Sequence, residues 1–157
     1  MIGNQTSAGT PALSGGVLDG DVHVLPLRVY YEDTDFSGIV YHANYLRFFE
    51  RGRTEFIRAL GIDQRSLHRD EGVAFAVRSM NVEFLRPALM DDIVAVETRA
   101  GLVRGSSLGL DQTIRRGSDI LTTARVTVVC VRDGRPRRLP EALRLVLAGL
   151  GDAGSTA

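Results

Sequence analysis

Apolar residues follow a helical period in the first half of the chain. From residue 43 to residue 60 they recur at steps of three and four, which predicts a helix with one broad buried face. The apolar positions are Tyr45, Phe48, Phe49, Gly52, Phe56, Ala59 and Leu60. The arginines between them, Arg47, Arg51, Arg53 and Arg58, are predicted to point away from this face. Gly61 is a suitable stop signal for the helix.

Strand-like segments lie on both sides of this helix. β-Branched and aromatic residues predict one strand before it, at residues 24–31. After Gly72 the chain changes to strand character, and turn residues divide it into four predicted strands, at residues 74–85, 92–102, 106–115 and 120–131. A shorter helix is predicted over residues 63–71 with Asp63 as its cap, and another over residues 141–148 after Pro140. Consecutive strands joined by tight turns predict an α+β fold, an antiparallel sheet packed against the long helix.

The two ends of the chain differ in composition from the middle. Residues 1–20 are rich in Gly, Ser, Thr, Ala and Pro and are predicted to form a flexible extension. Residues 149–157 are predicted to be a similar tail. Since residues 21–148 contain no linker and no repeat, they are predicted to form a single domain.

Charge and composition narrow the class of protein. Lys+Arg and Asp+Glu both number 19, so the overall charge does not indicate a nucleic-acid partner. We expect no membrane span and no signal peptide, and therefore a cytoplasmic location. The single cysteine, Cys130, excludes an intrachain disulfide, is predicted to be a buried strand residue, and provides no basis for a metal site. His23 and His68 are expected at the surface.

The segment immediately before the long helix is the best candidate for chemistry. It places Asp35, Gly38 and His42 within one short loop ahead of a helix N-terminus. The N–H groups at a helix start are unpaired and lie at the positive end of the macrodipole. They can polarise a carbonyl group or hold an anion.

This segment also carries a family resemblance. Residues 33–45 (DTDFSGIVYHANY) and 49–55 (FERGRTE) resemble the signature of hotdog-fold acyl-CoA thioesterases of the 4-hydroxybenzoyl-CoA thioesterase family, in particular its Tol-Pal-associated branch. The similarity continues through residues 77–80, 87–92, 104–108 and 128–131. The resemblance implies a hotdog fold, in which an antiparallel sheet of five or more strands wraps around a central helix, and a homodimer or homotetramer.

The resemblance also implies roles for individual residues. Asp35 matches the catalytic carboxylate, which acts as a general base or as a nucleophile. His42 occupies the position whose backbone N–H receives the thioester carbonyl oxygen, and its ring can position water or protonate the leaving thiolate. Independently of the resemblance, Tyr41 and Tyr45 are most simply core residues of the helix, although they lie near enough to the loop to line an acyl pocket. Arg104 and Ser106 lie near the nucleotide of coenzyme A or in a solvated hairpin.

Three further positions have alternative interpretations. The run of residues 135–138 is a phosphate patch or, more simply, an exposed turn. Glu50 and Glu55 offer a second carboxylate, but ion pairs with Arg47, Arg51 or Arg58 are the expected role. Phe36 fills a variable position of the motif and can line the site.

Two classes of function follow. The first is a thioesterase that hydrolyses short-chain or aromatic acyl-CoA, in which coenzyme A is part of the substrate and no separate cofactor is needed. The second is a scaffold that binds acyl carrier protein in lipid or cell-envelope metabolism, with incidental hydrolysis. Hotdog dehydratases use a differently placed acid and histidine, and this loop lacks that arrangement.

Overall fold

One antiparallel sheet forms the body of the protein, as seen in a computed structural model that describes residues 12–153. The strand order is β1-β2-β4-β5-β6-β3, and β7 also pairs with β6. The strands are β1 Val17–Asp19, β2 Val22–Arg28, β3 Val73–Phe84, β4 Ile93–Arg104, β5 Ser107–Arg116, β6 Asp119–Arg132 and β7 Arg135–Pro136. The helices are η1 Tyr31–Asp33 (a 3-10 helix), α1 Asn44–Ala59, α2 Gln64–Glu71 and α3 Glu141–Ala153.

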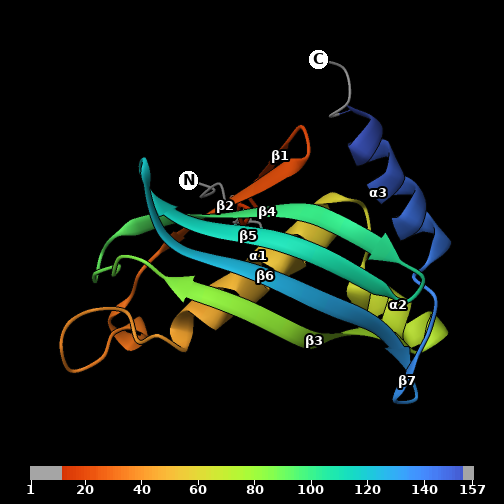
Figure 1. The fold of residues 1–157 in the computed structure, drawn as a ribbon, viewed down its shortest axis with the longest axis horizontal. Coiled ribbons are helices and arrows are strands. Elements are labelled where there is room, and N and C mark those ends of the chain that lie inside the picture. Colours follow the sequence, from red (N-terminus) through yellow and green to blue (C-terminus); the bar gives the residue numbers. More distant parts are fainter. Residues whose placement is uncertain (1–11, 154–157) are drawn as a thin grey trace, which may run out of the picture.

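The sheet curves across α1, which crosses one of its faces (Figure 1). The predicted α+β hotdog arrangement is therefore confirmed, with two short strands, β1 and β7, in addition to the five predicted ones. The four long strands after the helix each begin and end within two residues of their predicted bounds.

The apolar face of α1 forms the centre of the core. Phe48, Phe49 and Phe56 have no exposed surface, and they pack in one cluster with residues of the sheet. Gly52 lets the helix approach the sheet, because a Cβ there would lie only 2.6 Å from Cγ1 of Val96. The glycine in the apolar pattern therefore marks a close approach of the helix to the sheet.

Several boundaries differ from the predicted ones. Residues 17–19, predicted to belong to the flexible extension, form β1 and pair with β2. Helix α3 continues to Ala153, beyond its predicted end at residue 148. The predicted cap of α2 is confirmed, since Asp63 accepts a hydrogen bond from the backbone N–H of Arg65 at 2.9 Å.

Two polar residues predicted at the surface are buried, so both predictions were wrong. His23 has no exposed surface, and its Nε2 lies 2.8 Å from the carbonyl oxygen of Gly15. Arg53 lies on the inner side of α1, where it donates to Oε1 of Gln112 at 2.9 Å and pairs with Glu50. A buried guanidinium is tolerated because these partners replace its water contacts.

The predictions for Cys130 and Glu55 agree with the structure, whereas the one for Glu50 was wrong in its partner. Cys130 is fully buried in β6, and this burial raises the pKa of its thiol. Glu55 pairs with Arg58 at 3.5 Å, as expected, whereas Glu50 pairs with Arg53 instead of a surface arginine.

Among residues 12–153, no helix is both long and apolar enough to cross a membrane.

Candidate active site

The loop before α1 is a tight hairpin that presents Asp35 to solvent. Thr34 and Val40 form a bridge at its base, and the N–H of Asp35 donates to the carbonyl of Ile39 at 2.9 Å. The N–H of Gly38 closes the turn by donating to the carbonyl of Asp35 at 3.0 Å. Gly38 has a φ of +85°, a conformation that residues with a Cβ rarely adopt. The glycine therefore allows the turn that carries the carboxylate.

The Asp35 carboxylate is exposed but has defined partners. Its Oδ1 accepts hydrogen bonds from the backbone N–H of Ser37 at 2.8 Å and from the Ser37 hydroxyl at 2.5 Å. These bonds stabilise the anion and lower the pKa of Asp35, with a smaller contribution from the nearby His42. The group is therefore ionised at neutral pH, as a base or nucleophile must be.

The N-terminus of α1 offers backbone donors beside this loop. Ala43 occupies the cap position in a helical conformation and makes no side-chain cap. Within residues 12–153, the N–H groups of His42 and Ala43 have no hydrogen-bond acceptor. The next one, that of Asn44, donates to the carbonyl of Tyr41 at 2.8 Å. Two donors at the positive end of the helix are thus available to an oxygen ligand.

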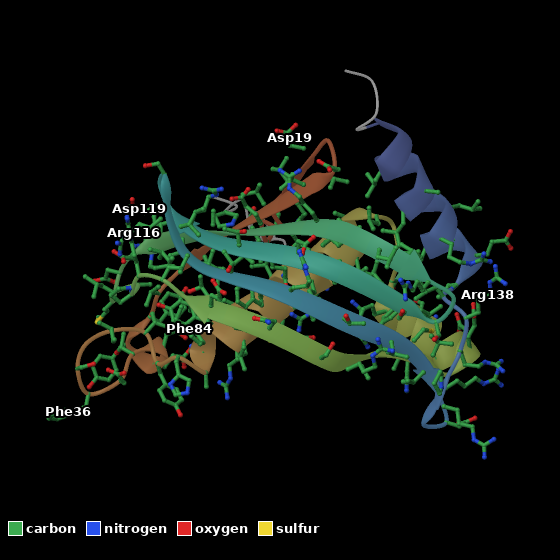
Figure 2. The ribbon with its side chains drawn as sticks, viewed as in Figure 1. Asp19, Phe36, Phe84, Arg116, Asp119 and Arg138 are labelled. Carbon is green, nitrogen blue, oxygen red and sulfur yellow. The ribbon has the colours of Figure 1, made fainter. Side chains whose placement is uncertain are left out.

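Aromatic rings line the region around His42. The His42 ring lies 4.6 Å from the Tyr41 ring and 6.2 Å from the Phe84 ring, measured between centroids. Phe84 ends β3 and is half exposed beside the loop, whereas Phe36 projects outward from its tip (Figure 2). The site therefore has an apolar wall next to its donors and its carboxylate.

Tyr41 and Tyr45 have different surroundings. Tyr41 is half exposed next to His42. Tyr45 is buried, and its hydroxyl accepts a hydrogen bond from the backbone N–H of Ala88 at 2.9 Å. Burial raises the pKa of Tyr45. The structure thus brings Asp35, His42 and Tyr41 together and places the Tyr45 hydroxyl in a core contact.

Arg104 and Ser106 lie at the other end of the sheet. The N–H of Val29 donates to the carbonyl of Asp92 at 2.8 Å, which places the start of β4 close to the strand that leads into the Asp35 loop. Arg104 ends this 12-residue strand, and eleven steps of about 3.3 Å place it about 36 Å along the strand from the start of β4. Figure 1 shows the Asp35 loop and the C-terminal end of β4 on opposite sides of the molecule. In Figure 2, Arg138 lies on the same side as the C-terminal end of β4. One protomer alone does not join Arg104 and Ser106 to Asp35.

Two polar residues of the motif have contacts for which sequence reasoning assigned no role. Asp33 is only 4% exposed. Its carboxylate accepts a hydrogen bond from the side-chain amide of Asn44. The only sequence signal was the position of both residues within the motif.

Residues 29–147 match a family model described as the thioesterase-like superfamily. The chain belongs to this thioesterase superfamily. The matched segment contains the complete Asp35 loop, α1 and strands β3 to β6. The family predicted from the motif is therefore confirmed, and the chain is a hydrolase of the thioesterase type.

Individual thioesterases of bacteria are also similar to this chain. It is 46% identical over 121 residues to the acyl-CoA thioester hydrolase YbgC of Escherichia coli O6:H1, which covers 75% of this chain and 90% of that protein. It is 43% identical over 110 residues to the acyl-CoA thioesterase YbgC of Haemophilus influenzae, with 70% and 81% covered. A crystal structure of a probable thioesterase from Bartonella henselae superposes with a TM-score of 0.74 at 42% identity, covering 76% of this chain and 99% of that one.

Proposed function

We propose that this thioesterase hydrolyses acyl-CoA thioesters between the Asp35 carboxylate and the N-terminus of α1. One observation carries the proposal: an ionised, accessible carboxylate lies in the same short segment as backbone N–H groups that have no acceptor among the residues the structure describes. The similarity to proteins named acyl-CoA thioester hydrolases supports the choice of coenzyme A as the carrier.

The proposed reaction begins when the thioester oxygen binds the N–H of His42. Negative charge grows on this oxygen as the carbonyl carbon becomes tetrahedral, and one well-placed donor contributes about 3–4 kcal/mol to the transition state. Asp35 either removes a proton from the attacking water or attacks the carbonyl carbon itself. In the second route the C–S bond breaks, a mixed anhydride forms on Asp35, and water then hydrolyses it. The His42 ring can protonate the departing thiolate.

We propose a short-chain or aromatic acyl group as the substrate class. Tyr41 and Phe84 are each about half exposed beside His42, and flat rings of this kind pack well against an aromatic acyl group. Phe36 is fully exposed at the loop tip, where it can cover a bound acyl chain.

We also propose a homodimer or homotetramer assembled through β3. This strand ends the sheet, is 12 residues long and carries exposed apolar residues such as Val77 and Phe84. Long unprotected edges tend to pair with another strand. In an antiparallel pair of two copies, the Val73 end of one β3 would meet the Phe84 end of the other. Arg104 of one copy would then approach the Asp35 loop of the other. This arrangement would give Arg104 and Ser106 access to the nucleotide of coenzyme A.

A second candidate function is a scaffold for acyl carrier protein. The observation that favours it is the exposed turn after β6, where Arg135, Arg137 and Arg138 gather at one end of the sheet. Arginines of this kind suit an acidic protein surface as well as a phosphate group. Hydrolysis would then be incidental.

The decisive experiment measures thiol release from coenzyme A thioesters of graded chain length and from benzoyl-CoA. We expect turnover by the wild-type protein and a loss of about 10²–10⁴-fold in kcat for Asp35→Asn. Asp111→Asn is a matched control, since Asp111 is an exposed carboxylate paired with Arg125 at 3.1 Å on the sheet. Equal rates for Asp35→Asn and the control would refute the proposed mechanism.

The scaffold is tested separately by binding to purified acyl carrier protein. Retention of the carrier by wild type and Asp35→Asn alike, without thiol release by either, would favour the scaffold. Loss of the carrier on Arg137→Glu, with normal hydrolysis of acyl-CoA, would assign the arginine turn to carrier docking only.

A further inference from the structure

Asp33 is the most buried carboxylate near the proposed site. Its Oδ2 accepts a hydrogen bond from the backbone N–H of Tyr30 at 2.8 Å, and its Oδ1 accepts one from the side-chain amide of Asn44. Its backbone carbonyl accepts a third from the N–H of Tyr41 at 2.9 Å. One residue therefore contacts the segment that follows β2, the segment before the helix and the first residue of α1.

These contacts surround the two halves of the proposed site. Asp35 lies two residues after Asp33, and His42 lies between Tyr41 and Asn44, both of which are bonded to Asp33. The N–H of Asn44 also donates to the carbonyl of Tyr41 at 2.8 Å, so the backbone on both sides of His42 is held. Two of these contacts are made by backbone groups, and the third, from the Asn44 side chain, is made to the buried Asp33 carboxylate, which therefore helps to hold the His42 N–H relative to the Asp35 loop.

We infer that Asp33 is a positioning residue for hydrolysis, which holds the N–H of His42 at the angle and distance needed by the thioester oxygen. This inference rests on the proposed function of Asp35 and His42. Asp33 is not a catalytic residue, because its two oxygens are occupied by Tyr30 and Asn44 and it is buried away from substrate.

The two donors around position 33 require a side chain that accepts a hydrogen bond at both of its ends. An aspartate accepts hydrogen bonds at both oxygens, whereas an amide at position 33 accepts at one end and donates at the other. In Asp33→Asn the amide group would therefore face a second donor, either the Tyr30 N–H or the Asn44 side chain. The conflict is relieved by moving the helix start, which shifts the proposed oxyanion donor.

The test compares Asp33→Asn with Asp63→Asn in the full chain, using benzoyl-CoA and hexanoyl-CoA as substrates. Asp63 also accepts hydrogen bonds from backbone N–H groups and from a side chain, but it caps α2 away from the loop. For Asp33→Asn we expect kcat to fall about tenfold or more with KM changed less than threefold, since small misplacements of reacting groups have effects of this size. For Asp63→Asn we expect kcat to stay within twofold of wild type. A folded Asp33→Asn protein with kcat within twofold of wild type overturns the inference.

Asn44→Ala tests the positioning role of Asp33 if the Asp33→Asn protein does not fold. Alanine favours the helix, so this variant removes the contact to Asp33 without lowering helix propensity. We expect a folded protein with a lower melting temperature, because Oδ1 of the buried Asp33 loses its donor, and a kcat about tenfold lower. An unchanged kcat in this variant also overturns the inference.

The exchange variant, Asp33→Asn combined with Asn44→Asp, separates positioning from simple stability. It restores a donor facing an acceptor between the two positions, and a carboxylate in the first turn suits the helix dipole. We expect kcat to recover to within threefold of wild type. Recovery of the melting temperature without recovery of kcat counts against the inference. If Asp35→Asn keeps full activity, the proposed function itself fails, a result distinct from any of these.

Discussion

The Asp35 carboxylate and Ser37 are joined by two hydrogen bonds to the same oxygen, at 2.8 Å from the backbone N–H and 2.5 Å from the hydroxyl of Ser37. This contact holds the carboxylate ionised and leaves its second oxygen, Oδ2, available. Both residues lie within one four-residue turn, so the Asp35 carboxylate and the Ser37 groups that lower its pKa move together. The pH dependence of the enzyme should therefore report on Ser37.

Ser37→Ala removes the hydroxyl and keeps the backbone hydrogen bond. The hydroxyl is the largest cause of the lowered pKa of Asp35, so its loss raises that pKa. If Asp35 acts as an anion, activity will be lost at a higher pH in the variant than in wild type as the solution is acidified. The measurement is kcat/KM against pH. Ser66→Ala, which removes the equivalent hydroxyl beside Asp63 at 2.9 Å, is the control and should leave the profile unchanged. An acid limb that stays in place in Ser37→Ala would contradict this role.

Gly38→Ala tests whether the turn conformation matters for activity. Gly38 has a φ of +85°, and a Cβ added there would meet no atom within 4 Å, so the substitution introduces backbone strain without a clash. We expect a loss of stability of about 1–2 kcal/mol and a lower kcat. Gly61→Ala is closely matched, because Gly61 has the same φ of +85° and equally open surroundings at the other end of α1. It should lose similar stability and keep its kcat, and an equal loss of kcat in both would disprove a local effect.

Gly52→Ala tests the close approach of α1 to the sheet. The added Cβ would lie 2.6 Å from Cγ1 of Val96, and overpacking of this kind lowers stability by about 1–3 kcal/mol. Gly149→Ala is the control, since Gly149 is also helical but has nothing within 4 Å. That variant should gain about 0.5–1 kcal/mol. Chemical denaturation measures both, and a stabilised Gly52→Ala protein would show that the contact is not tight.

The Cys130 thiol should not react in the native protein. It is fully buried, and burial raises its pKa, so little of the reactive thiolate forms. We expect an aromatic disulfide reagent to label one thiol per chain in denaturant and almost none in buffer, with Cys130→Ser as the unlabelled control. Rapid labelling of the native protein would contradict the burial. The result also matters for assays of thiol release, because the enzyme itself would add no background.

The sequence by itself determined the elements whose causes are local. The three- and four-residue period of Phe48, Phe49 and Phe56 predicted α1, strand-like segments between turn residues predicted β3 to β6, and Asp63 predicted the cap of α2. The motif from residue 33 to residue 45 also identified the family, because its residues are contiguous along the chain.

Only the tertiary structure decided which polar residues are buried. His23 and Arg53 look like surface residues because their partners, Gly15 and Gln112, come from other parts of the sequence. Asp33 likewise looks like an ordinary loop carboxylate until the fold places the Asn44 side chain on it. The physical reason is the cost of burying a polar group, which is offset only by partners that folding brings together. The amphipathic period cannot report these partners, and so the support for the site became visible only in three dimensions.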